Sequence, residues 1–247
     1  MSETESTTQP SFVLVHGSWH GAWCWRRVLP LLRQSGAEAH AVTLTGVGER
    51  AHLLSPSIGI ATHVQDVIGL IDAEELGEVI LVGHSYAGNL ITCVADRLQA
   101  RSPGLLKHLV YLDAGVPQPG DSWSSPHTPE TVQKRIEESR LSGGLSFPPP
   151  DARVFGLEGE DRDWVNRRQT PQPFRLYQEP LHFDAARVAA LPRTFIDCTN
   201  PPLPTIDAAR KRVRSEPGWT VVELATGHDP MVSAPLALAD ILLGIAR

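Results

Sequence analysis

The chain has 247 residues, of which 41% are hydrophobic and 20% are charged, and its formal net charge is −6. This length suits one α/β unit with an insertion, and the composition is ordinary for a globular protein. A mildly acidic chain without a basic stripe is a poor candidate for binding nucleic acid or an anionic membrane. No apolar run approaches the roughly 20 residues that span a bilayer. We therefore expect neither a nucleic-acid partner nor a membrane.

The first ten residues, 1–10, are polar and acidic, without the basic start and apolar stretch of a signal peptide. We expect them to form a flexible leader. The cysteines are odd in number and far apart, which argues against a disulfide framework and against a metal site: Cys24, Cys93 and Cys198. We expect a reduced cytoplasmic protein whose cysteines pack as small apolar residues. A homodimer is among the assemblies that the sequence allows.

Short apolar runs alternate with longer amphipathic stretches along most of the chain. The runs typical of buried strands are 12–16, 39–44, 79–82, 108–112, 194–198 and 220–224. Helical patterns lie between them, at 25–35, 63–75, 87–101, 206–215 and 235–245. Strands that alternate with helices imply parallel pairing through right-handed crossovers. We expect an α/β fold with a mostly parallel sheet of about six strands and helices on both faces.

One segment, 116–183, interrupts this alternation. It is rich in proline, has no convincing buried strand and carries a helical pattern near 131–141. A long disordered loop is the alternative, but disorder seldom carries so many aromatic side chains: Trp123, Phe155, Trp164, Phe174 and Tyr177. We expect a helical cap at 116–183, inserted into a core made of 11–115 and 184–247.

The motif Gly83-His84-Ser85-Tyr86-Ala87-Gly88 follows one expected strand and opens the helix expected at 87–101. A strand, a tight turn and a helix form the context of a nucleophile elbow, which places a serine at the carboxyl end of the sheet. The helix N-terminus favours negative charge that develops beside that serine. We predict Ser85 as the nucleophile. Ala87 departs from the G-x-S-x-G pattern, but alanine is nearly as small as glycine.

A second turn, His16-Gly17-Ser18-Trp19, follows the first expected strand. Glycine lets the backbone approach a reacting carbonyl, and the nucleophile-elbow fold takes one oxyanion donor from this loop. We predict an oxyanion hole formed by the backbone N–H groups of Ser18 and Tyr86. A plain strand-ending turn is the alternative for His16-Gly17.

The general base is predicted to be His228. It lies in Thr226-Gly227-His228-Asp229-Pro230, after the last expected strand and before the last expected helix. The chain order in this fold is serine, acid, histidine, and His228 is the histidine that lies in this loop.

The sequence departs from the usual pattern of this fold at the position of the acid. Its usual place, after the strand expected at 194–198, holds Asn200. Asparagine can orient an imidazole but cannot stabilise its charged form, and the equivalent loss in serine proteases lowers turnover by about 10⁴. Asp113, at the end of the strand expected at 108–112, is the preferred acid. Asp197 and a neutral Asn200 stay as alternatives.

With these motifs the chain resembles small α/β-hydrolases: the plant methylesterases and hydroxynitrile lyases, and more closely the bacterial carboxylesterases of pyrethroid type. The stretches that carry the resemblance span nearly the whole chain after Ser11: 13–25, 44–50, 83–88, 111–114, 169–173 and 227–229. The resemblance implies the α/β-hydrolase fold, a cap over an apolar pocket, no metal or organic cofactor, and esters with hydrophobic or aromatic parts as substrates.

The expected function is that of a serine carboxylesterase acting on a small-molecule ester. Trp19, Trp123 and Trp164 are expected to shape its pocket, although each could instead be a core residue. Three alternatives stay open: a lyase, a cofactor-free oxygenase in which His228 alone abstracts a proton, and a ligand-binding protein without activity on the same fold. Asp229 argues against the lyase, because lyases of this group carry a lysine there to manage cyanide charge.

Overall fold

The structure is a computed structural model that describes residues 10–247. The predicted leader therefore lies outside the described residues, apart from Pro10. The strands are β1 (Ser11–Val15), β2 (Ala39–Val42), β3 (Val79–His84), β4 (Leu106–Leu112), β5 (Ser146–Phe147), β6 (Gln172–Pro173), β7 (Arg193–Cys198) and β8 (Thr220–Leu224). The α-helices are α1 (Leu29–Gln34), α2 (Ile60–Ala73), α3 (Ala87–Arg101), α4 (Pro129–Arg140), α5 (Gly159–Asn166), α6 (Arg175–Gln178), α7 (Ala185–Ala189), α8 (Asp207–Ser215), α9 (Pro230–Ser233) and α10 (Pro235–Ile245). Short 3-10 helices are η1 (Ala22–Arg27), η2 (Gly48–Leu53), η3 (Ala152–Phe155) and η4 (Pro204–Ile206).

The main sheet has six parallel strands in the order β2-β1-β3-β4-β7-β8. This confirms the predicted α/β class and the parallel sheet. Each expected strand is present within two residues at either end, and α3 and α10 match the expected helices at both ends. The apolar runs are reliable here because strands covered on both faces read as nearly continuous hydrophobic segments.

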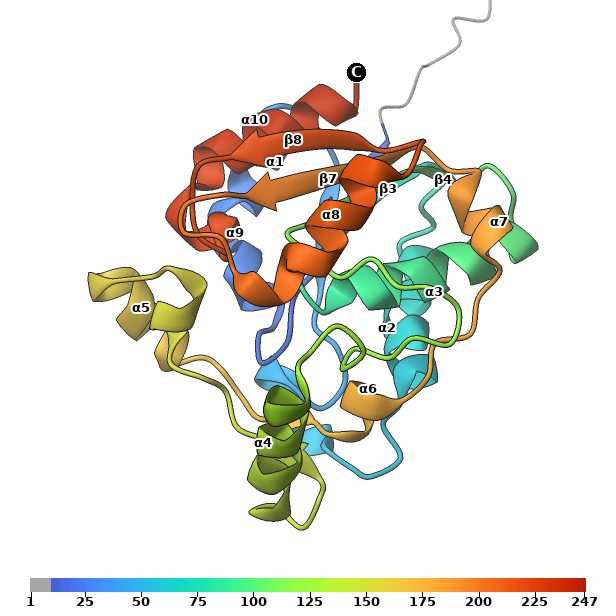
Figure 1. The fold of residues 1–247 in the computed structure, drawn as a ribbon. Coiled ribbons are helices and arrows are strands. Elements are labelled where there is room, and N and C mark those ends of the chain that lie inside the picture. Colours follow the sequence, from blue (N-terminus) through green and yellow to red (C-terminus); the bar gives the residue numbers. More distant parts are fainter. Residues whose placement is uncertain (1–9) are drawn as a thin grey trace, which may run out of the picture.

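Helices cover both faces of the sheet, as predicted (Figure 1). Alternate side chains of β1 face opposite sides, as the two-residue period of a strand requires. Val13 and Val15 pack with α2, α3 and α8, whereas Phe12 and Leu14 pack with α1, α9 and α10. The sheet is therefore buried between two apolar layers, and its carboxyl-terminal edge is where the loops with the predicted site residues emerge.

The segment 116–183 holds α4, α5 and α6, which lie apart from the sheet in Figure 1, α4 and α6 in the lower part and α5 at the left. It also holds a pair of two-residue antiparallel strands, β5 and β6. Strands this short leave no readable period in a sequence, which is why no strand was expected there. That this segment acts as a cap stays a prediction at this point.

All three cysteines are free and buried, and Cys24 and Cys198 are fully enclosed by the core. They pack as small apolar side chains, as expected. Among the described residues, the helices are too short or too polar to cross a bilayer.

The tightest packing in the elbow occurs at Gly88. A β-carbon there would lie 2.1 Å from the carbonyl oxygen of Gly115 and 2.8 Å from Cβ of Ala114. Ala87, the departure from the usual motif, is fully buried in the core. The close approach of α3 to the loop after β4 thus requires glycine at position 88, whereas position 87 accommodates a methyl group.

We expect Gly88→Ala to lower the free energy of unfolding by about 1–3 kcal/mol, because the added methyl overlaps backbone atoms that cannot move away. Urea denaturation measures this change. Gly69→Ala is the matched control: it also lies in a helix, and the atom nearest to an added β-carbon is 4.0 Å away. It should raise stability by about 0.5–1 kcal/mol. Equal effects of the two substitutions would contradict the packing argument.

Candidate active site

Ser85 stands in the turn between β3 and α3 with a φ of +55°. Residues other than glycine rarely adopt this left-handed conformation, which costs about 1–3 kcal/mol. Hydrogen bonds to the neighbouring strand and loop hold it: Ser85 N donates to Leu112 O, and Ser85 O accepts from the amides of Gly88 and Gly115, each at 3.1 Å. The strained turn lifts the serine side chain out of the strand.

His228, in the loop between β8 and α9, connects Ser85 to Asp113. Its Nε2 lies 2.9 Å from Ser85 Oγ, and its Nδ1 lies 2.6 Å from Asp113 Oδ2. Because a carboxylate only accepts, Nδ1 carries the proton, and Nε2 accepts the serine hydroxyl. The backbone is held too: His228 N donates to Phe155 O at 2.9 Å, and His228 O accepts from His84 Nε2 at 2.8 Å.

Of the three candidate acids, the structure brings Asp113 to His228. Asp113 is fully buried and also has a left-handed φ of +41° at the end of β4. Asp197 instead binds Arg210 and Arg214, at 2.5 and 2.6 Å. Asn200 is exposed, and its backbone N–H donates to a backbone carbonyl. The group that faces the imidazole is therefore the carboxylate of Asp113, which follows β4, the strand next to β3.

Arg210 of α8 is a site residue that sequence analysis missed. Its Nη2 donates to Asp113 Oδ1 at 2.7 Å, on the oxygen that does not face His228. Its Nη1 bonds to Leu203 O at 2.7 Å and to Asp207 at 2.9 Å. The sequence offers no signal for it, because α8 carries several basic residues and only the fold distinguishes the one that is buried.

The loop after β1 is shaped by His16. Leu44 N donates to His16 Nε2 at 3.1 Å, so Nδ1 carries the proton and donates to Gly17 O at 2.7 Å. The carbonyl of Gly17 and the N–H of Ser18 belong to one trans peptide and point in opposite directions. Holding the carbonyl therefore turns the Ser18 N–H the other way. A β-carbon on Gly17 would lie 3.0 Å from Cβ of Ser85, so the loop passes directly beside the serine.

Tyr86, which precedes α3, is buried and extends away from the elbow. Its hydroxyl lies 3.2 Å from His63 Nδ1, and His63 Nε2 donates to Thr45 O at 2.9 Å. The ring packs 5.0 Å from Trp123. The side chain thus anchors the start of α3, where the Tyr86 amide follows Ser85 directly.

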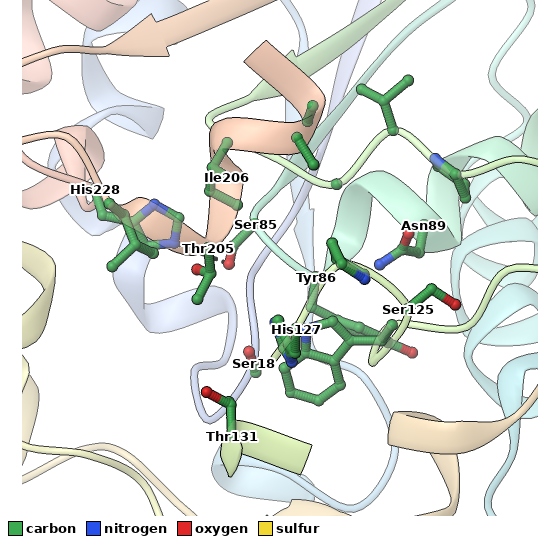
Figure 2. Close-up of a pocket in the computed structure, with 18 of the residues that line it drawn as sticks. Ser18, Ser85, Tyr86, Asn89, Ser125, His127, Thr131, Thr205, Ile206 and His228 are labelled. Carbon is green, nitrogen blue, oxygen red and sulfur yellow. Dashed lines mark hydrogen bonds between the residues drawn. The ribbon is translucent and has the colours of Figure 1, made fainter. Parts of the chain in front are cut away.

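These residues meet in a cavity of about 320 Å³ that Ser18, Ser85, Tyr86 and His228 line together (Figure 2). The core contributes Thr205, Ile206, Ala209 and Arg212 from η4 and α8. The segment 116–183 contributes most of the rest, including Trp123, Ser125, His127, Thr131, Arg135 and Phe155. Burial and the nearby Arg135 lower the pKa of His127 to about 4, so this histidine is neutral at pH 7.

The three predicted pocket tryptophans separate into two groups. Trp19 and Trp123 line the cavity, with ring centroids 5.9 Å apart. Trp164 does not line it: its ring packs edge-on against Trp23 at 5.1 Å and lies beneath the guanidinium of Arg168. Sequence composition marks aromatic residues but does not tell a pocket wall from a surface cluster.

The side chains that come nearest to a metal-binding arrangement are His84, His228 and Asp229, whose possible ligand atoms lie within 4.8 Å of one another. Both ring nitrogens of His228 already bind Ser85 and Asp113, and His84 Nε2 bonds to the His228 carbonyl. A metal ion would have to displace one of these bonds, so the residues present fit hydrogen bonding better than metal binding.

Comparison with known proteins places this chain among hydrolases. Residues 12–241 match the alpha/beta hydrolase family. The chain is 40% identical to a carbendazim hydrolyzing esterase of Nocardioides sp. (strain SG-4G), over 95% of this chain and 99% of that protein. It is 25% identical to methylesterase 2 of Arabidopsis thaliana, over 98% of each.

Solved structures show the same fold. An extracellular alpha/beta-hydrolase from a Paenibacillus species superposes with a TM-score of 0.81 at 21% identity, over 96% of this chain and 99% of that chain. A pyrethroid hydrolase from Sphingobium faniae JZ-2 superposes with a TM-score of 0.69 at 22% identity, over 96% and 97% of the two chains. The expected resemblance to bacterial esterases and plant methylesterases is confirmed.

Stability should fall as the solution is acidified, because two buried histidines stay neutral in the fold. Burial is the main cause that lowers the pKa of His16 to about 3 and that of His63 to about 4, against about 6.5 in an unfolded chain. Between those values the unfolded chain binds more protons. Each histidine then removes about 1.4 kcal/mol of stability per pH unit. Urea midpoints at pH 6.5, 5.5 and 4.5 should decrease in turn, and a constant midpoint would refute the neutral assignments.

The three candidate acids give different results when each is replaced. Asp113→Asn should lower kcat on p-nitrophenyl acetate by about 10⁴, because the asparagine favours the wrong imidazole tautomer and cannot stabilise its charge. Asn200→Ala should stay within about twofold of the wild type, since small changes at exposed positions leave a buried site intact. Loss of kcat in Asn200→Ala with retention in Asp113→Asn would reverse the assignment. Circular dichroism of each variant checks that the fold persists.

Proposed function

Since the chain belongs to the alpha/beta hydrolase family and is a carboxylic ester hydrolase, we propose that it acts through a Ser85–His228–Asp113 triad. The observation that carries this proposal is the continuous hydrogen-bonded chain from Ser85 Oγ through both ring nitrogens of His228 to Asp113, at 2.9 and 2.6 Å, ending in the cavity. The tautomer required by Asp113 leaves Nε2 free to take the serine proton.

The proposed reaction has two acyl-transfer steps. His228 Nε2 takes the proton of Ser85 as Oγ attacks the ester carbonyl carbon, and Asp113 stabilises the imidazolium that forms. The carbonyl oxygen becomes an oxyanion, which the amides of Ser18 and Tyr86 stabilise by hydrogen bonds. The carbon–oxygen bond to the alcohol then breaks, and His228 returns the proton to that alcohol. Water, activated by His228, releases the acid from Ser85 by the reverse sequence.

The proposed substrates are small esters with hydrophobic or aromatic parts. The cavity volume of about 320 Å³ and the aromatic rings of Trp19, Tyr86, Trp123 and Phe155 favour a compact apolar acyl or alcohol group. The names of the relatives, a carbendazim hydrolyzing esterase and a methylesterase, support small esters of this kind. We propose that 116–183 serves as the cap over this site, since it supplies most of the aromatic and polar wall.

Ser85→Ala should abolish turnover of p-nitrophenyl acetate, because no other group would form the acyl-enzyme. Purified wild-type protein should also be labelled by a fluorophosphonate at Ser85, as located by peptide mass spectrometry, and the variant should not be labelled. Ser57→Ala, at an exposed loop serine, is the control and should keep full activity and labelling. Unchanged turnover in Ser85→Ala would refute the proposed nucleophile.

A further inference from the structure

A second aspartate–histidine pair lies beside the proposed triad. His20 Nε2 is 3.1 Å from Asp229 Oδ2, and both side chains are almost completely buried, at 1% and 0% exposure. The other ring nitrogen of His20, Nδ1, is 2.7 Å from the carbonyl oxygen of Ser18. The pair therefore connects the residue after the proposed base with the residue proposed as an oxyanion donor.

The hydrogen bonds fix the charge of His20. A carboxylate and a backbone carbonyl only accept, so both ring nitrogens must donate, and the ring is an imidazolium. Burial opposes this charge, but Asp229 outweighs it and raises the pKa of His20 above its ordinary value. The other titratable groups around the pair are His16, His84, His228, Cys24 and Cys198. His16 and His84 are neutral, since burial lowers the pKa of each.

The peptide that His20 holds lies in a strained part of the loop. Trp19 has a φ of +63°, which a bulky residue does not adopt without support. The Ser18 carbonyl accepts from His20, while the Trp19 N–H of the same peptide donates to Gln172 Oε1 at 2.8 Å. The Trp19 carbonyl accepts from Thr170 N at 2.9 Å. Of these three contacts, the one from His20 is charged and comes from the core. The contacts from Gln172 and Thr170 come from the segment 116–183.

The other end of the pair is tied to the base. Asp229 directly follows His228, and its Oδ1 lies 3.6 Å from Nε2 of His84, the nitrogen that bonds to the His228 carbonyl. A displacement of Asp229 would therefore move the loop that carries the imidazole. One buried ion pair thus links the loop that carries Ser18 to the loop that carries His228.

We propose that His20 and Asp229 are positioning residues that keep the Ser18 amide aligned with Ser85 and His228. This inference rests on the proposed function, because the Ser18 amide matters only if an oxyanion forms beside Ser85. The contact between the Ser18 amide and the oxyanion is needed in the transition state rather than in substrate binding. Its loss should therefore lower kcat and leave KM unchanged.

Two substitutions of His20 separate its two contacts. In His20→Asn the amide nitrogen takes the place of Nδ1 and keeps the bond to the Ser18 carbonyl. In His20→Gln the amide nitrogen takes the place of Nε2 and keeps the bond to Asp229, but it loses Ser18. We expect His20→Gln to lower kcat on p-nitrophenyl acetate by about 10- to 100-fold, since a displacement of about 1 Å can cost 10²-fold. His20→Asn should lose markedly less, and KM should be unchanged in both.

Asp229→Asn provides an independent variant if His20→Gln does not fold. With the charge removed, the asparagine NH2 donates to Nε2 and His20 is neutral, so its bond from Nδ1 to the Ser18 carbonyl loses its charge assistance and weakens. We expect kcat to fall by about tenfold at unchanged KM, which corresponds to about 1.4 kcal/mol of transition-state stabilisation. Urea denaturation of each variant measures stability separately from turnover.

The results distinguish this inference from the function on which it rests. Ser85→Ala is assayed alongside: if it is active, the proposed function itself fails. If Ser85→Ala is inactive while the His20 and Asp229 variants match the wild type in kcat, only the positioning role is refuted. A purely structural role would lower kcat equally in His20→Asn and His20→Gln, in step with their stability, and that outcome would also overturn the proposal.

Discussion

The arrangement of the site depends on Asp113, whose two carboxylate oxygens bind different partners. Oδ2 faces His228 at 2.6 Å, and Oδ1 faces Arg210 at 2.7 Å. Burying a carboxylate costs free energy unless it is paired and hydrogen-bonded. Here His228 and Arg210 meet these requirements, one at each carboxylate oxygen. The imidazole is thereby held in one tautomer, and Arg210 ties α8 to the carboxyl end of β4. Ser85, His228, Asp113 and Arg210 then form one connected set of hydrogen bonds.

Two backbone features bring these side chains to one edge of the sheet: neighbouring parallel strands, and a residue in the left-handed conformation after each strand. Ser85 and Asp113 follow neighbouring strands, β3 and β4, and both have a positive φ. A residue that leaves a parallel strand in the left-handed conformation points its side chain beyond the end of the sheet rather than into a packed face. The loop after β1 reaches the same edge through Trp19, which is likewise left-handed. The backbone cost at each position is offset by hydrogen bonds from surrounding loops.

Much of this could be predicted from the sequence because the sheet and the elbow are local patterns. Ser85, His228 and the turn at His16 follow recognisable strands, so their place in the chain implies their place at the sheet edge. Asp113 could be proposed only as one of three acids, since nothing local distinguishes a carboxylate facing an imidazole from one facing an arginine. Arg210, His20 and Asp229 are defined by contacts across 97 and 209 positions of the chain, which no periodicity encodes. For the same reason the sequence does not distinguish Trp164, which lies outside the cavity, from Trp19 and Trp123, which line it.

The position of α8 has a further consequence. Its Ala209 and Arg212, together with Ile206 at its start, form one wall of the cavity, while Arg210 on the same helix holds Asp113. The cavity wall and the support of Asp113 are thus two sides of a single helix. A bound group bulky enough to push this wall outward would move Arg210 relative to Asp113 and so disturb the alignment of Asp113 with the His228 imidazole. If the proposed triad acts, an oversized ester would therefore be rejected by slower turnover as well as by poorer fit.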